Sequence, residues 1–393
     1  MEIKKNNSGN SWINAGSVII FLLLFSIMAA SNVTAPIYEL YALKYHFGPF
    51  IITDIFAIYV LMLIPSLLFW GQYSDKHGRK LPIAIGVIME LIGLLSFLFA
   101  INVYMLFLAR AFMGLASGAI AGPASTLLFN YNKRAGAVLT SIGTSAGTAT
   151  GPLLGGIMAQ YLPYPFRLVY LLSIILVLLP AMAIYPIKDI STKNPKLILH
   201  FPSIDREVIR PFLLSSFVAF GAWSITAFFM SLAPVYIIKL SGLNSIAIGG
   251  IIVFLMLGIA SIFQIISLKF KIQKSMFSGM VFIIFAIVFI LIAIIRNSLY
   301  IFIAGTLLAG IGQGFAFTGA TREIKAIAPP EKTGDMLANY YIIIYTGVGL
   351  PVILLGLLDK IIGLLQGIIF YGLAFIAFSM VIGFLLIMED FKD

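Results

Sequence analysis

Three ionisable residues lie inside long apolar stretches of this sequence, where charges are rare. Glu90 and Arg110 lie deep in two of these stretches, and Asp54 lies about one turn inside a third. A charged side chain in hydrocarbon costs about 3 kcal/mol or more unless it is paired or hydrated. A carboxylate that meets a guanidinium in only one conformation can take up and release a proton. Glu90, Arg110 and Asp54 are therefore our candidates for proton coupling; the alternatives are a structural ion pair for the first two and an interfacial cap for Asp54.

The elements that carry these residues are predicted to be membrane-spanning helices. Of the 393 residues, 61% are hydrophobic and only 10% are charged, against about 25% charged in soluble domains, so a water-soluble protein is excluded. Apolar runs of this length favour helices over the alternating strands of outer-membrane barrels. The runs cover residues 15–36, 50–70, 81–101, 104–129, 137–162, 166–185, 212–237, 246–268, 276–295, 300–324, 336–358 and 362–386.

The twelve runs fall into two sets of six that resemble each other. A hydrophilic stretch at 187–210 separates them, so we predict bundles at 1–186 and 211–393 with a cytoplasmic linker between. The tetrapeptide Ala-Pro-Ile-Tyr at 35–38 returns as Ala-Pro-Val-Tyr at 233–236. Two parallel halves of six spans are a known transporter plan, with the binding site between them.

The distribution of charge predicts the orientation. The chain has 25 Lys and Arg against 15 Asp and Glu, a net charge of +10. If the N-terminus is cytoplasmic, most of the basic residues fall in loops on the cytoplasmic side. The positive-inside rule therefore predicts a protein of the cell membrane with both termini in the cytoplasm. The net positive charge is thus explained by the basic residues of the cytoplasmic loops, and we expect no nucleic-acid partner.

Several kinds of chemistry are not expected. The sequence has no cysteine, and its three histidines are scattered in loops, so we expect no metal site. It has no Walker-type phosphate loop, so ATP is not the expected energy source. We expect no cofactor and no enzymatic activity.

The loop at residues 71–80 has the pattern G-x-x-x-D-x-x-G-R-K. The pattern comprises Gly71, Asp75, Gly78, Arg79 and Lys80. It closely resembles the signature of the major facilitator superfamily of transporters, and the alternative is a turn with positive-inside charges. The resemblance implies that Asp75 helps to latch the cytoplasmic side shut, with the start of the eleventh span near Gly334 and Arg134 as available partners.

A second pattern lies in the fifth span. Its members are Gly147, Gly151, Pro152, Gly155 and Gly156. They resemble the antiporter motif of the drug:proton branch of that superfamily, which implies an exporter; the alternative is close helix packing with a proline bend. Arg110 also resembles part of this branch's proton-transfer motif, although Met113 stands where a glutamine is usual.

The superfamily resemblance further implies a central cavity lined by spans 1, 4, 7 and 10. The polar or aromatic residues at depth on these spans are Asn32, Tyr38, Trp223, Gln313 and Phe317. Aromatic walls with few polar groups suit an apolar or cationic organic molecule. The alternative for each is packing or a lipid-facing position.

Together these features predict an all-α membrane protein with twelve spans in two six-helix bundles. The predicted function is secondary active transport by alternating access, as proton-coupled export of a small organic compound or drug by a monomer. One alternative is a proton-coupled importer or a uniporter of a metabolite such as a sugar or an organic acid. An alternative of another class is a membrane sensor that does not transport.

Overall fold

The computed structural model is helical throughout its described parts and contains no strand there. It describes residues 15–131, 136–187, 189, 204–241, 245–329 and 333–390. The first half holds α1 (Ala15–Asn32), η1 (Ala35–Ile37), α2 (Tyr38–Tyr45), α3 (Pro49–His77), α4 (Lys80–Leu98), α5 (Val103–Tyr131), α6 (Gly136–Tyr161) and α7 (Pro165–Ala183). The second half holds α8 (Ile209–Ser231), α9 (Ala233–Ser241), α10 (Ile246–Ser267), α11 (Ile272–Arg296), α12 (Leu299–Ile327), α13 (Thr333–Ile362) and α14 (Leu364–Asp390).

Eleven stretches of the described chain are long and apolar enough to cross a membrane. The first runs from Ala15 to Tyr45 and is longer than the predicted 15–36, because the chain continues as a short helix after Pro36. The remaining predicted span corresponds to α6, which has 26 residues and carries many glycines and hydroxyls. Since α6 packs between α1 and α10, both of its small-residue faces meet protein. An all-helical membrane protein is confirmed.

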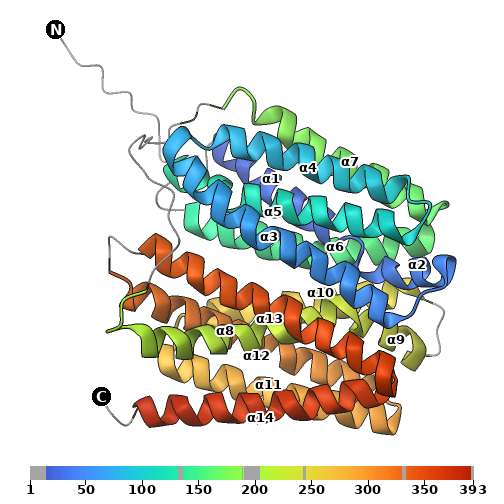
Figure 1. Cartoon of the computed structure of the whole chain (residues 1–393), viewed down its shortest axis with the longest axis vertical. Coiled ribbons are helices and arrows are strands. Elements are labelled where there is room, and N and C mark those ends of the chain that lie inside the picture. Colours follow the sequence, from blue (N-terminus) through green and yellow to red (C-terminus); the bar gives the residue numbers. More distant parts are fainter. Residues whose placement is uncertain are drawn as a thin grey trace.

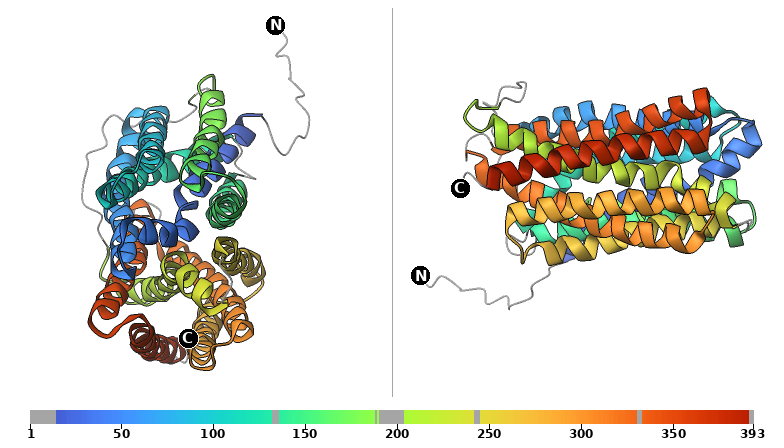
Figure 2. Two further views of the ribbon diagram at one scale, coloured as in Figure 1. Left: turned by 90° about the vertical axis from the view of Figure 1, so that its right-hand side faces the viewer. Right: turned by 90° about the horizontal axis from the view of Figure 1, so that it is seen from below.

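The helices form two groups. Helices α1–α7 occupy the upper part of Figure 1 and α8–α14 the lower part, and the view along the helices in Figure 2 shows the same two groups. Each group surrounds a hydrophobic core, and the core of the second group also takes in Phe56 and Val60 of α3 and Ala149 of α6. The predicted linker at 187–210 falls largely outside the described residues, so its limits stay a prediction.

The repeated tetrapeptide marks the same structural event in both halves. Pro36 lies in η1, directly before α2, and Pro234 lies in the first turn of α9. Proline has no N–H to donate and is favoured in the first turn of a helix, which is where Pro36 and Pro234 lie, just after each long helix ends. Both short helices lie at the right-hand end of Figure 1. We call this the outer end, after the orientation that the basic residues predict.

The two halves meet through α6 and α10 near the outer end. An added Cβ on Gly156 would lie 3.1 Å from the carbonyl oxygen of Ile246 and 3.2 Å from the Cα of Gly250, so the two backbones are almost in contact. The side-chain oxygen of Gln160 accepts a 2.8 Å hydrogen bond from the N–H of Ile246. This hydrogen bond ties the last turn of α6 to the first residue of α10.

The other line of contact joins α3 to α13. Gly356 leaves room for the side chain of Thr53, whose Cβ lies 3.0 Å from the place where a Cβ of Gly356 would stand. Further along, a Cβ on Gly349 would lie 3.7 Å from the Cβ of Val60. We call the contacts of α6 with α10 and of α3 with α13 the outer seam. In this structure the outer end is therefore closed.

A stripe of glycines on α6 lets this helix lie directly on α1. An added Cβ at each of these glycines would press on the backbone of α1 or of the residue that follows it, and the contacts are one helical turn apart. The pairs are Gly147 with Phe25, Gly151 with Ala29 and Gly155 with Val33. Glycines four apart allow this close approach. The packing interpretation of the motif in the fifth span is thus seen in the structure.

We predict that Gly151→Ala destabilises the protein although Gly122→Ala does not. Both changes gain about 1 kcal/mol of helix propensity. At Gly151 the new methyl group meets the backbone of Ala29, whereas nothing lies within 4 Å of it at Gly122. Overpacking costs about 1–3 kcal/mol, so the melting temperature in detergent should fall for Gly151→Ala only. Equal melting temperatures would contradict the packing of α6 on α1.

We also predict that cysteines at Val60 and Gly349 cross-link. Their Cβ separation of 3.7 Å lies within the disulfide range of about 3.5–4.5 Å, and the chain has no cysteine of its own. With a protease site inserted in the linker, the oxidised double variant should run as one band after cleavage and as two after reduction. Each single variant should give two bands throughout. Separate halves from the oxidised double variant would disprove the contact between α3 and α13.

Candidate functional site

Arg110 is buried inside the first half, with only 2% of its surface exposed. Its Nη1 donates a 2.6 Å hydrogen bond to the backbone carbonyl of Ser31, near the end of α1. The guanidinium carbon lies 4.2 Å from the ring centre of Tyr59 and 5.7 Å from that of Phe56, both on α3. One carbonyl and two aromatic rings thus replace part of the hydration that this charge loses.

Glu90 is completely buried and meets the same serine. The hydroxyl of Ser31 donates to the two carboxylate oxygens at 2.9 and 3.0 Å. Glu90 and Arg110 are therefore joined through Ser31, by its hydroxyl and its carbonyl, and not by a direct ion pair. Gly93, one turn along α4 from Glu90, brings α4 close to α5, since a Cβ there would lie 2.9 Å from the carbonyl oxygen of Ala109.

Two more hydroxyls extend this arrangement. The Oγ of Ser117 lies 3.4 Å from the Oγ of Ser31, and the Oη of Tyr59 donates a 2.9 Å hydrogen bond to Ser117. We call these five residues the Glu90 network: Ser31, Tyr59, Glu90, Arg110 and Ser117. Ser31, Ser117 and Tyr59 are not among the candidates predicted from the sequence. The seven-residue spacing from Arg110 to Ser117, two helical turns on one face, is a signal that would have found one of them.

Asp54 lies apart from this network. It is half-buried on α3 at the outer seam, and the charge that acts on it comes from Lys360 of α13. The ammonium of Lys360 itself lies 5.3 Å from the ring centre of Phe50. The structure thus brings Glu90 and Arg110 together and places Asp54 between the two halves.

The loop pattern at 71–80 is held by an unexpected residue. A carboxylate oxygen of Asp189 accepts hydrogen bonds from the backbone N–H of Arg79 at 2.8 Å and of Lys80 at 3.4 Å, at the start of α4. A negative charge is favoured at a helix N-terminus. Gly78 has φ 105°, a conformation that suits glycine.

The expected partners of this pattern are not tested. Gly71 and Asp75 lie on the last two turns of α3, and the side chain of Asp75 is outside the described part. Arg134 is outside it as well. Gly334 lies in the first turn of α13. The latch therefore stays a prediction.

The five cavity candidates form two groups. In the second half, Trp223 of α8 packs edge-on against Phe317 of α12, with ring centres 5.5 Å apart. Gln313 is buried one turn away and accepts a 3.4 Å hydrogen bond from Gln264. In the first half, Asn32 donates to the carbonyl of its own helix at Met28 (2.7 Å), and Tyr38 is buried in the core. Their contact with a substrate stays a prediction.

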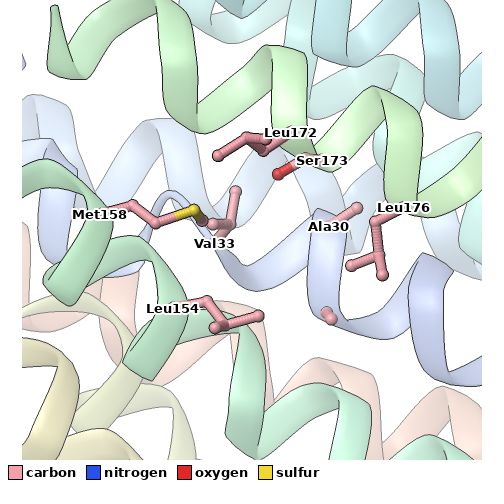
Figure 3. A pocket seen from close by; sticks show the side chains of 8 residues that line it. Ala30, Val33, Leu154, Met158, Leu172, Ser173 and Leu176 are labelled. Atoms are coloured by element: carbon pink, nitrogen blue, oxygen red, sulfur yellow. The ribbon is translucent and has the colours of Figure 1, made fainter. Parts of the chain in front are cut away.

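A cavity of about 170 Å³ lies elsewhere, between α1, α6 and α7 (Figure 3). Its walls are apolar, apart from Ser173, whose hydroxyl is bonded to the carbonyl of Val169 on its own helix. None of the candidate residues lines it. Within the described residues, no group of three His, Asp or Glu side chains is arranged to hold a metal.

Solved transporter structures share this fold. One is a bacterial homologue of the human lysosomal transporter Spinster in an inward-facing, unoccupied conformation, with a TM-score of 0.77, 14% identity and coverage of 96% of this chain and 98% of that one. Another is a POT family transporter in complex with 5-aminolevulinic acid, with a TM-score of 0.76, 14% identity and coverage of 93% and 95%. At these identities the likeness is one of fold.

Curated relatives are similar over part of their length. Multidrug resistance protein MdtG of Proteus mirabilis is 30% identical over 186 residues, which are 44% of each chain. MdtG of Escherichia coli strain SMS-3-5 is 29% identical over 171 residues, 37% of this chain and 40% of that protein. The matched part spans less than half of these relatives.

The family model of the Major Facilitator Superfamily matches residues 20–294, which is more than half of the chain. This match includes the loop pattern at 71–80, the glycine stripe of α6 and the whole Glu90 network. The expected fold, with a helical bundle on either side of a central line of contact, is the one described above. The chain belongs to the Major Facilitator Superfamily.

Proposed function

We propose that this transporter exports small organic compounds in exchange for protons, and that Glu90 carries the proton. The observation that supports this most strongly is the buried carboxyl group of Glu90 and the buried guanidinium of Arg110, both bonded to one serine. The names of the MdtG relatives, which are multidrug resistance proteins, support the export of organic compounds.

The Glu90 network favours a switch over a purely structural pair. A direct bidentate pair would be the geometry that best repays the desolvation of both charges. Here the carboxylate relies on a neutral hydroxyl and the guanidinium on a neutral carbonyl. One proton on Glu90 removes the negative charge and leaves Arg110 as the uncompensated charge of the network. The stability of this conformation therefore depends on protonation.

Along the chain, Ser31 of the Glu90 network lies just before the residues that contact the outer seam. Two residues after Ser31, the backbone of Val33 supports Gly155 of α6. Next comes η1, which contacts α8, α9 and α10 of the other half. A shift of Ser31 is thus passed to the segment that helps to close the outer end. Protonation and opening of the outer end are coupled in this way.

The proposed substrate class is inferred from two aromatic side chains of the second half. Trp223 and Phe317 supply two aromatic faces on the two helices that the superfamily resemblance places at the cavity. Flat, apolar or cationic compounds bind such faces. We further propose that the protein works as a monomer in the cell membrane with both termini in the cytoplasm, as its basic residues predict.

The proton site is tested with Glu90→Gln in proteoliposomes, with ethidium as substrate and a pH-sensitive dye inside. Because the amide keeps the hydrogen bond to Ser31 but cannot take a proton, ethidium-driven proton movement should fall about tenfold or more. Exchange of external for internal ethidium should continue.

The matched control is Glu389→Gln. Glu389 lies on α14, and its carboxylate lies 4.0 Å from the guanidinium of Arg210. It is on a helix that carries no residue of the Glu90 network, so its replacement should leave proton movement unchanged. Normal proton movement in Glu90→Gln would remove this residue from the mechanism. Ethidium uptake driven into the compartment that gains protons would instead identify an importer.

We predict that Asp54 strengthens the outer seam through Lys360. An exposed charge pair contributes about 0.2–1 kcal/mol, so Asp54→Asn and Lys360→Gln should each slow the Val60–Gly349 cross-link by about fivefold or less, and to the same extent. Lys44→Gln is the control, because Lys44 lies over Tyr45 and Phe166 of its own half. Unchanged cross-linking in both variants would contradict this role.

A further inference from the structure

We propose that Tyr59, Ser117 and Ser31 form the path by which protons reach and leave Glu90. This inference rests on the proposed function, in which Glu90 carries the proton. It adds the route and names its entrance, Tyr59, at the interface between the two halves.

The hydrogen bonds run in one direction. Each hydroxyl has a single proton to donate. Ser31 gives its proton to Glu90 and Tyr59 gives its proton to Ser117. The 3.4 Å contact between the two serines is the longest link, and it must therefore have Ser117 as donor and Ser31 as acceptor. All three donors point toward the carboxylate.

Burial identifies the open end of the chain. Glu90 and Ser31 have no exposed surface and Ser117 has 1%, whereas Tyr59 is only half-buried. Tyr59 is also packed against the hydrophobic cores of both halves. Tyr59 is therefore the member of this chain that lies at the interface of the two halves, near Tyr345 of α13, and our proposal places the entrance there.

The transfer balances at every atom. A hydronium ion at the open end gives one proton to the Oη of Tyr59, which passes its own proton to the Oγ of Ser117. Ser117 passes its proton to Ser31, and Ser31 passes its proton to the carboxylate of Glu90. The products are water, three neutral hydroxyls and a carboxylic acid. Release follows the same bonds in reverse, because after uptake each transferred proton lies between its new oxygen and the hydroxyl it came from.

Other ionisable groups near the network do not offer a second path. The guanidinium of Arg110 on α5 has only donors and no acceptor, so it cannot take up a proton and pass it on. Tyr38 of α2 and Tyr170 of α7 lie near Arg110, and Tyr345 of α13 lies near Tyr59. Among the described residues, Ser31 is the only side chain that donates a hydrogen bond to Glu90. A proton that reaches Glu90 through side chains therefore passes through Ser31.

The path is tested with Tyr59→Phe and Ser117→Ala in the same proteoliposomes with ethidium. Tyr59→Phe keeps the ring over Arg110 and removes one oxygen. In both variants ethidium-driven proton movement should be slower by about tenfold or more, while ethidium–ethidium exchange keeps its rate. Ser117→Thr, which keeps a hydroxyl, should restore proton movement.

The matched control is Ser66→Ala. Ser66 lies on α3 two turns from Tyr59, is buried, and donates a 2.6 Å hydrogen bond to the carbonyl of Leu115 on α5. It therefore resembles the path residues in packing between α3 and α5 but lies outside the chain. Its removal should change proton movement and exchange by less than about twofold.

Each other outcome overturns the path. Wild-type proton movement in both Tyr59→Phe and Ser117→Ala would exclude it, and the role of Glu90 would still be decided separately by Glu90→Gln. An equal slowing of proton movement and of ethidium exchange would mean that the hydroxyls only support the fold. Normal proton movement in Glu90→Gln would remove the proposed function and the path together.

Discussion

Two opposite charges held by one serine are the constraint on which the first half depends. Neither Glu90 nor Arg110 is stable in the low-dielectric interior without compensation, and both find it on Ser31. Because the three residues lie on α4, α5 and α1, the requirement for compensation fixes three helices relative to one another. The glycine at position 93 and the rings of α3 serve the same requirement, by closing α4 onto α5 and by covering the guanidinium.

Ser31 lies at the end of α1, so the constraint also acts on the segment that follows α1 at the outer end. Ser31 is the second-last residue of α1, and the chain then bends through η1 into α2 at the outer end. Pro36 lies in η1, and the matching Pro234 lies in the first turn of α9, directly after α8 ends in the other half. A change of charge at the network therefore acts on a segment that is already separated from its helix, not on the middle of a rigid rod. Physical coupling between two sites requires an element with two arrangements, and our proposal places that element at the segment between α1 and α2.

How much of this was predictable depends on the range of each interaction. The helical fold, and the choice of Glu90 and Arg110 as candidate residues, follow from composition, since charges in apolar helices are few and costly. Ser31 did not stand out, because a hydroxyl in a membrane helix ordinarily bonds to its own backbone. Asp189 contacts a loop 110 residues earlier in the chain, and no local pattern encodes such a contact. The depth of Asp54 was visible in the sequence, but its neighbour across the seam was not.

The glycines of α6 show why a packing motif and an exporter motif need not be alternatives. Gly155 lies on the backbone of Val33, while Gly156, the next residue, lies on Gly250 of α10. Neighbouring residues of a helix point to different sides, so α6 is in backbone contact with the end of α1 on one side and with the other half on the next. A side chain at either position would hold one of these surfaces apart. The same absence of side chains that makes the packing close also places the Glu90 network only one helix away from the outer seam.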